Sequence, residues 1–327
     1  MKQKVIVYGL GENFQSDCAA IHEKYDVVGC CDRDERKFVL LPKGSNTISR
    51  AQLKGFLSFC DFVLLAMSYN RFDIAQDLVV NLDIPADKIG FFRYSGELDE
   101  ENALVHNGME FYGQFADDAV LLILMRCLNY KKIADIRYLE IGTNDPIISN
   151  NTFLFYSLGA RGVLVDPLPL VEAQARKMRP RDRVLRAAVS STGGKTATFI
   201  MSAATQGSSL HSEYAGNKPT KISVPVLGIN ELLYDIGFIP DIFVVDAEGE
   251  DENIVRNIDF HKYRPVVMEI EINKAEQDGK MLTSFLKSKG YEMFTRIGSN
   301  GIYVDKSALK KADFDSVNRF ICGEHDA

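Results

Sequence analysis

The sequence predicts an α/β protein made of two doubly wound, Rossmann-like domains. Short β-branched runs alternate with helix-patterned segments, which is typical of parallel sheets with crossover helices. Acidic residues stand at or just past the carboxyl ends of several of these runs, where open α/β sheets bind their ligands. The length of 327 residues allows two domains that each bury a core.

Four strands are predicted in the first half of the chain: Val5–Tyr8, Val27–Cys31, Phe62–Ala66 and Ile89–Phe92. Helical spacing at Ile74–Asn81 connects the last two. The pattern ends in the acidic, polar stretch Glu97–Asn102, which we interpret as a linker. We therefore expect a first domain at residues 1–100 and a second at residues 108–327.

The second half opens with an apolar-periodic segment, Asp117–Tyr130, which predicts a helix packed in a core. Predicted strands follow at Arg137–Ile141, Gly162–Val165, Val184–Val189, Ile242–Val245 and Val266–Ile270. Two more strands, Tyr291–Arg296 and Asn300–Asp305, are joined by a glycine-rich turn. These seven strands predict a second sheet with acids along its carboxyl edge.

Composition and charge exclude several classes. With 38 Lys+Arg against 45 Asp+Glu, the net charge of −7 lacks the footprint of a nucleic-acid binder. No apolar run approaches the ~20 residues of a membrane span. The six cysteines show no C-x-x-C spacing and no signal-peptide pattern precedes them, so we expect free thiols and a cytoplasmic location. The basic run from Arg176 to Arg186 is interpreted as a solvated helix end and loop; contact with acceptor phosphates is the alternative.

The first predicted strand runs into Gly9-Leu10-Gly11, and Asp32 follows at the end of the second strand. In a nucleotide fingerprint the first glycine makes the turn, the second admits a phosphate at a helix N-terminus, and the acid accepts from a ribose hydroxyl. Phe14 stands where the dinucleotide form has its third glycine. A nucleotide or nucleotide-sugar site is therefore predicted at Gly9, Gly11 and Asp32. A redox nicotinamide site and a purely structural turn are the alternatives.

Two segments, Val5–Asn13 and Val27–Lys37, resemble the small Rossmann-like domains of bacterial sugar-modification proteins. The resemblance extends over roughly residues 1–95. It implies that this half binds a nucleotide, a nucleotide-sugar or a related group.

The most informative segment of the second half is Glu140–Pro146, at a predicted strand end. An acid followed by a glycine suits a ligand that carries an amino group close to the turn. Asp166, at the next strand end, can accept from both hydroxyls of a ribose. No G-x-G is present here, which argues against a pyrophosphate because no bare backbone is offered to it.

Four stretches in this order resemble the FkbM family of S-adenosylmethionine (SAM)-dependent methyltransferases. They are Leu139–Thr152, Gly159–Pro167, Ala187–Ser190 with Gly207–Leu210, and Asp241–Gly249. The resemblance implies a class I methyltransferase sheet that uses SAM. It places Glu140, Gly142 and Asn144 at the methionine end of the donor. It also places Asp166 at the ribose and Ala188 beside the adenine.

The same resemblance implies O-methylation, which needs a positioned acceptor and a base for its hydroxyl proton. Asp246 and Glu248, just past the fourth strand of this half, are the base candidates, and His211 is a further one. Ser208 and Ser209 are candidate substrate contacts.

A divalent cation is an open addition to this prediction. Together with Glu269 or Glu271, the carboxylates of Asp246 and Glu248 would offer the hard oxygen ligands of Mg²⁺ or Ca²⁺. The same oxygens serve equally as bases, so no residue is assigned as a metal ligand.

The sequence thus predicts a SAM-dependent methyltransferase that acts on a carbohydrate hydroxyl, on a nucleotide-sugar or a surface-glycan precursor in polysaccharide biosynthesis. A homo-oligomer is left open as the assembly. One alternative is a nicotinamide-dependent sugar oxidoreductase that uses the Gly9–Gly11 turn. Another is a non-catalytic nucleotide-sugar-binding or scaffold protein.

Overall fold

The computed structural model describes residues 2–67, 71–92, 104–106, 109–128, 131–201, 220–272 and 279–313. Two compact units make up the chain. Unit 1 is formed mainly by Met1–Asp99, and unit 2 begins at Glu100. The predicted linker Glu97–Asn102 lies outside the described residues.

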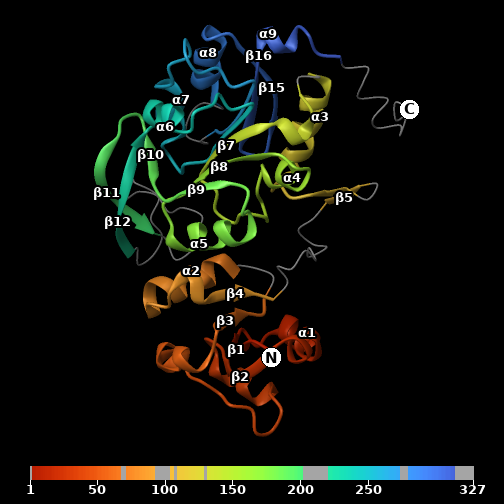
Figure 1. Cartoon of the computed structure of the whole chain (residues 1–327), viewed down its shortest axis with the longest axis vertical. Helices are drawn as coiled ribbons and strands as arrows, with labels where there is room; N and C mark the ends of the chain where they lie inside the picture. Colours follow the sequence, from red (N-terminus) through yellow and green to blue (C-terminus); the bar gives the residue numbers. More distant parts are fainter. Residues whose placement is uncertain are drawn as a thin grey trace. The chain divides into compact units, whose positions relative to one another are not determined.

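Unit 1 is built on a four-stranded parallel sheet with the order β2-β1-β3-β4 (Figure 1). The strands are β1 (Lys4–Tyr8), β2 (Asp26–Cys31), β3 (Phe62–Leu65) and β4 (Ile89–Phe91). All four predicted strands are confirmed to within one residue at either end. The strand order reverses between β1 and β3, which makes the carboxyl ends of these strands the expected ligand-binding edge.

Helical segments connect the strands of unit 1. They are α1 (Glu12–Lys24), the 3₁₀ segments η1 (Glu35–Leu40) and η2 (Arg50–Phe59), α2 (Arg71–Leu82) and the short η3 (Ala86–Lys88). Right-handed crossovers place α1 on one face of the sheet and α2 on the other, where α2 packs with η2. Phe14 on α1 is buried in the core between this helix and the sheet, together with Leu10 and Ile21.

Unit 2 contains a seven-stranded sheet with the order β15-β16-β14-β13-β7-β8-β9. Its strands are β7 (Arg137–Ile141), β8 (Arg161–Val165), β9 (Arg183–Leu185), β13 (Ile242–Val245), β14 (Val267–Glu271), β15 (Tyr291–Ile297) and β16 (Asn300–Asp305). Only β16 runs against the other strands of this sheet. The order reverses between β7 and β13, so the turns that follow these two strands meet at the switch point.

Helices cover both faces of this sheet. They are α3 (Asp117–Cys127), η4 (Ile133–Asp135), α4 (Phe153–Ser157), α5 (Pro169–Met178), α6 (Ile229–Asp235), α7 (Asp251–Arg256), α8 (Lys280–Ser288) and α9 (Lys306–Leu309). Leu139, Phe243 and Met268 point to the face where the apolar side chains of α6, α7 and α8 form the main core. Glu140 and Glu269 alternate with these residues and therefore point to the opposite face.

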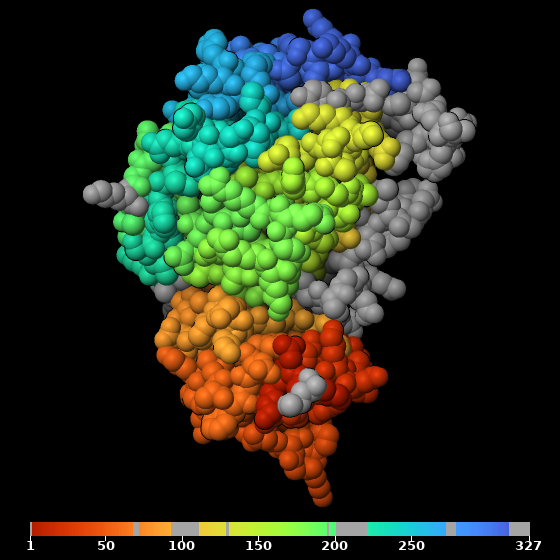
Figure 2. Space-filling view, viewed as in Figure 1, coloured from red at the N-terminus to blue at the C-terminus, as the bar shows by residue number. Residues whose placement is uncertain are grey.

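The predicted strand Val184–Val189 is wrong, because the chain changes sheets within it. Leu185 is the last residue of β9, and the Ala187 N–H still donates to the Asp166 carbonyl oxygen (3.2 Å) beside it. The chain then enters β10 (Ala188–Ser190) of a separate sheet with β11 (Gly194–Met201) and β12 (Thr220–Gly228), which the sequence did not predict. In Figure 2 the green and turquoise atoms of β11 and β12 lie side by side at the left edge of the view.

Two smaller features complete the described structure. A hairpin is formed by β5 (Leu104–His106) and β6 (Met109–Phe111). Among the described helices, none has both the length and the apolar character that crossing a membrane requires.

Candidate active site at the carboxyl edge of unit 2

The turns after β7 and β13 approach each other closely at the switch point. Gly142 has φ +85°, and its N–H donates to the Val165 carbonyl (2.9 Å). The Asp246 N–H donates to the Ile141 carbonyl (2.9 Å). A Cβ on Gly142 would lie 1.7 Å from the Asp246 carbonyl oxygen, so only glycine fits between the two turns. The predicted donor residue Gly142 and the predicted base Asp246 are thus neighbours.

Two polar atoms in the loop after β7 are buried without a hydrogen-bond partner in the described structure: Thr143 Oγ1 and Asn144 Oδ1. Asn144 also holds the left-handed conformation at φ 48°. An unpaired polar atom costs free energy on burial, so such atoms beside a glycine turn are expected to bond to a ligand. This edge therefore offers oxygen atoms to a ligand, and their contact with the methionine end of SAM stays a prediction.

Asp166 follows β8 and is 5% exposed. Its Oδ2 accepts from the Asn144 N–H (3.0 Å) and its Oδ1 from the Leu168 N–H (2.9 Å). No lysine or arginine of the described residues pairs with it. Burial raises the pKa of Asp166 to about 7, against the lowering effect of the two N–H donors. A carboxylate of this kind is suited to hydroxyl donors such as a ribose diol.

Ala188, the predicted adenine neighbour, is buried at the start of β10. The main chain just before it bonds back to the residue that follows β8, since the Ala187 N–H reaches the Asp166 carbonyl. Asp166 and Ala188 are therefore held near each other on the same edge.

Glu140 is 3% exposed and is held by a buried network. Its Oε2 accepts from the Thr152 hydroxyl (2.8 Å) and from Asn150 Nδ2 (3.2 Å). Arg179, which is fully buried, donates to Thr152 Oγ1 (2.8 Å) and Asn150 Oδ1 (2.9 Å), with Nη1 at 3.7 Å from Glu140. Burial raises the pKa of Glu140 while Arg179 lowers it. Glu140 thus orients the loop that carries Asn144 through this network.

Arg179 corrects the interpretation of the basic run as wholly solvated. It is the largest fully buried side chain among the described residues, and its Nε donates to the buried Asp182 (2.8 Å). Nothing in the spacing of six similar residues distinguishes the one that turns inward. Only its place directly after α5, at the C-cap of a helix that packs on the sheet, separates it from its neighbours.

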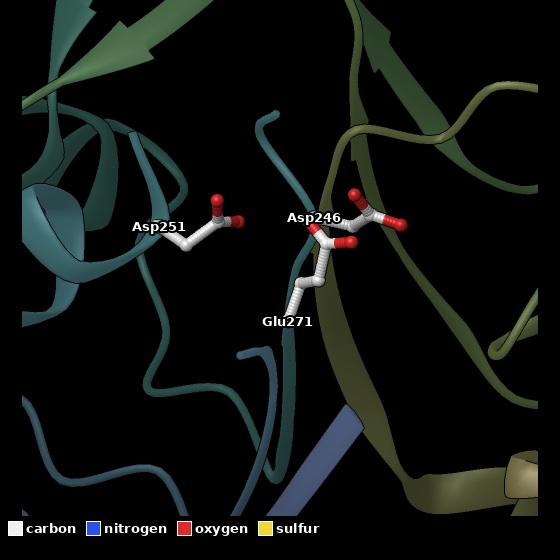
Figure 3. A group of neighbouring side chains, drawn as sticks. All are labelled: Asp246, Asp251 and Glu271. Atoms are coloured by element: carbon white, nitrogen blue, oxygen red, sulfur yellow. The ribbon is translucent and has the colours of Figure 1, made fainter. Parts of the chain in front are cut away.

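Carboxylates from three elements meet just beyond β13 and β14 (Figure 3). Asp246 follows β13, Asp251 begins α7 and Glu271 ends β14, with one oxygen of each within 4.8 Å of the others. Asp251 closes the turn after β13, since it accepts from the N–H groups of Ala247 (2.6 Å) and Gly249 (3.1 Å). The group is of a size that suits a divalent cation or a shared proton.

The proximity of these acids changes how they titrate. The pKa of Asp246 is raised well above its ordinary range. The first cause is the loss of water around the carboxyl, and the next is repulsion from the negative charges of Glu271, Asp251 and Glu248. The Asp246 side chain is nevertheless open to solvent, which means that protein surrounds the carboxyl without covering it. Burial raises the pKa of Asp251 to about 6, and burial with Asp251 raises that of Glu271 to about 7. At neutral pH this group therefore holds protons that it can exchange.

Glu248, the second base candidate, lies in the same turn with φ 47°, next to Gly249 at φ 104°. It is half-buried and contributes negative charge to Asp246, Asp251 and Glu271. The predicted turn after β13 thus brings both candidate carboxylates to one edge.

Glu269 lies deeper, at 1% exposure, on the face that Glu140 shares. Its Oε1 accepts from Asn151 Nδ2 (2.8 Å) and Asn300 Nδ2 (3.1 Å), whereas Oε2 is buried without a partner in the described structure. Burial, followed by repulsion from Asp117, raises its pKa well above the ordinary range. Glu269 is thus separate from the Asp246 group, although the sequence offered both Glu269 and Glu271.

The other predicted site residues of this half are not placed. His211, Ser208 and Ser209 lie outside the described residues. Conversely, sequence analysis missed Asp251, which the run of acids from Asp246 to Asp251 would have suggested, and Arg179 with its partners Asn150 and Thr152.

In unit 1 the three predicted nucleotide residues lie together. Gly9 has φ +95° and Gly11 precedes the first turn of α1. Asp32, 4% exposed, accepts from the Leu10 N–H (2.7 Å) and pairs with Lys37 (3.1 Å). All three predicted residues line one cavity of about 470 Å³.

Comparisons with known proteins bear on each unit. A family model described as the methyltransferase FkbM domain matches residues 140–293, and a model described as C2185-like, N-terminal, matches residues 1–90. The crystal structure of a TehB-like SAM-dependent methyltransferase from Corynebacterium glutamicum is similar at 13% identity and a TM-score of 0.32, over 58% of this chain and 88% of that one. A search of curated proteins finds no significant match.

The open sheet of unit 2, with its single antiparallel strand, is of the α/β class that the sequence predicted. The family match identifies a SAM-dependent methyltransferase with SAM as its methyl donor. More particularly, residues 140–293 are an FkbM methyltransferase domain, as the resemblance implied.

Proposed function

We propose that the enzyme transfers a methyl group to a hydroxyl of a carbohydrate, on a nucleotide-sugar or a surface-glycan precursor. The observation that carries the O-methylation proposal is the group of carboxylates beyond β13 and β14, in which Asp246 has a strongly raised pKa. A hydroxyl ionises far above neutral pH, so removal of its proton needs a base beside it, and a raised pKa makes a carboxylate a stronger base.

The donor site is proposed on the edge formed by Gly142, Asn144 and Asp166, with Glu140 orienting the loop and Ala188 beside the adenine. When bound, SAM supplies an electrophilic methyl group on a sulfonium. The chain's own residues then have three tasks. Asp166 holds hydroxyls, the Gly142 turn admits the donor close to the backbone, and Asp246 accepts the proton of the acceptor hydroxyl.

Glu248 is proposed to support Asp246, because its charge favours the proton on its neighbour. His211, Ser208 and Ser209 remain candidate acceptor contacts. The domain limits 1–100 and 108–327, a cytoplasmic location and a homo-oligomer belong to this proposal, as does a role in polysaccharide biosynthesis. A divalent cation at Asp246, Asp251 and Glu271 is kept as an addition that chelation tests directly.

The experiment measures methyl transfer from SAM to a panel of nucleotide-sugars and glycans by mass spectrometry, with S-adenosylhomocysteine (SAH) affinity as a second readout. Asp246→Asn is expected to lower kcat about 100-fold or more, in line with loss of a general base, while SAH affinity stays within about twofold. Glu252→Gln is the matched control and should leave kcat unchanged, because Glu252 lies on the following helix α7 and pairs with Arg256. Methylation of amine acceptors alone, or full turnover by Asp246→Asn, would contradict the proposal. A loss of activity with EDTA that Mg²⁺ restores would establish the cation.

A further inference from the structure

Unit 1 has a ligand-sized cavity whose lining includes none of the residues proposed for the methyltransferase reaction. Its volume is about 470 Å³, within the range of small-molecule sites. Residues that follow β1, β2 and β3 line it, including Gly11, Asp32 and Met67. These strand ends flank the point where the strand order reverses, which is where open α/β sheets bind their ligands.

Asp32 is not available in the way that a dinucleotide site requires. Its Oδ2 accepts from the Leu10 N–H (2.7 Å) and its Oδ1 from the Asp34 N–H (2.8 Å). Lys37 Nζ lies 3.1 Å from Oδ2 and 3.3 Å from Oδ1. Both oxygens accept backbone N–H groups, as those of Asp166 do, but the carboxylate of Asp32 also has a counter-ion. An adenosine ribose diol at this position would have to displace Lys37.

Two groups on the cavity wall can contact an anion. Asp77 is paired with Arg50, as Asp32 is with Lys37, and the third acid, Glu12, is exposed to solvent. Arg33, which is also exposed, lines the cavity and has no ion-pair partner among the described residues. The first turn of α1 also opens here without a side-chain cap, because Gly11 is its N-cap. Arginine and free helix N–H groups are the usual partners of phosphate.

Two further observations agree with a ligand in this space. Tyr8 lines the cavity and is 3% exposed, and its hydroxyl makes no hydrogen bond to another residue of the described part of the chain. A Cβ added at Gly11 would meet nothing within 4 Å, so the fold itself does not require glycine there. A hydroxyl that opens into the cavity from a buried side chain and an open position above a helix N-terminus both suit an occupant.

We propose that this cavity binds a phosphate ester, on a nucleotide or on a sugar, and discriminates against NAD. The phosphoryl group lies at Gly11 and Arg33, the Tyr8 hydroxyl donates to the bound ester, and Asp32 holds the glycine turn instead of a ribose. The inference is independent of the acceptor of the methyltransferase, since it concerns residues of unit 1 alone.

Calorimetric titration of the full chain with UDP, glucose 1-phosphate, inorganic phosphate and NAD tests this. At least one of the two esters should bind with Kd below about 1 mM and more tightly than NAD. Tighter UDP binding identifies a nucleotide, and tighter glucose 1-phosphate binding a sugar phosphate. Absence of ester binding, an ester that binds no better than inorganic phosphate, or NAD that binds as tightly as the esters would overturn the proposal.

Gly11→Val fills the open position and should weaken ester binding at least 10-fold. Gly55→Val is its matched control, because Gly55 also has nothing within 4 Å but lies on η2, outside the cavity wall. Tyr8→Phe keeps the buried ring and should weaken binding about fivefold, as loss of one hydrogen bond does. A urea unfolding transition of unit 1, identified as the one that added SAH does not shift, shows that unit 1 is folded in all three variants. Ester affinity equal in Gly11→Val and Gly55→Val would contradict the assignment of this cavity.

Discussion

The same pattern of hydrogen bonds holds the glycine turn at the carboxyl edge of the sheet in both units. In each, an acid after the second strand accepts from an N–H of the glycine turn after the first: Leu10 to Asp32 at 2.7 Å, and Asn144 to Asp166 at 3.0 Å. In each, the other oxygen accepts from the N–H two residues further along, at 2.8 and 2.9 Å. The glycine turns are φ-positive in both, at Gly9 and Gly142.

The difference is the counter-charge. Lys37 pairs with Asp32, whereas no cation of the described residues pairs with Asp166, whose pKa burial raises to about 7. An acid that is paired with a lysine can hold its turn, whereas an unpaired acid remains able to accept from hydroxyl donors. We propose that this one lysine directs the same loop geometry to two classes of ligand.

The largest effect is expected from the buried cation of unit 2. Arg179→Met leaves Asp182 and Glu140 buried without their cation and should lower the free energy of unfolding of unit 2 by about 4 kcal/mol. Lys37→Met, whose side chain is 38% exposed, should cost unit 1 under about 1 kcal/mol. Urea unfolding measures both, because added SAH shifts the unit 2 transition and so identifies it. Equal losses of unfolding free energy in the two variants would show that the buried ion pairs of Arg179 stabilise the protein no more than the partly exposed pair of Lys37.

The two glycine turns should differ next. Gly142→Ala sets a Cβ 1.7 Å from a backbone carbonyl oxygen, which cannot move without the turn after β13. We expect a loss of about 3 kcal/mol, from overpacking and the left-handed conformation together. Gly9→Ala meets only the end of Met67, at 2.1 Å, and should lose about 1 kcal/mol from conformation alone. Thermal unfolding of both variants ranks their losses of stability. A reversed order would mean that the turn after β13 moves away from the added Cβ at little cost in free energy.

Donor binding should separate the two acids by about two orders of magnitude. Asp166→Asn removes the charge that is suited to a ribose diol and is expected to weaken SAH binding about 100-fold. Asp32→Asn should leave it within about twofold, because unit 1 takes no part in holding the donor. Calorimetry of both variants gives the ratio, and their circular dichroism spectra should match that of the unchanged protein. A similar loss of SAH affinity in Asp32→Asn would indicate that unit 1 also contributes to donor binding.

The sequence predicted the strands of both parallel sheets well, because buried runs such as Ile242–Val245 carry local signals that end at turns and acids. It predicted Asp246 and Gly142 at one edge because each comes directly after a strand of a parallel sheet. The role of Arg179 was not predictable, since its burial depends on how α5 packs against the loop of Thr152, far along the chain. The pairing of Lys37 with Asp32 was likewise not predictable, because a separation of five residues in the sequence does not indicate an ion pair. The sequence therefore left Asp32 as a candidate for a ribose site.

The smallest effect expected is in the pH dependence of donor binding. Asp166 is protonated below its raised pKa of about 7 and is then a poorer acceptor for a diol, so affinity should rise as pH increases. Between pH 6 and pH 8 the ionised fraction grows about 10-fold, and SAH affinity should grow in proportion. Asp166→Asn should bind weakly with a flat profile over the same range, since it has no proton to lose. A profile that kept its slope in Asp166→Asn would assign the titration to another carboxyl, of which Glu271, raised to about 7 as well, is the nearest in pKa.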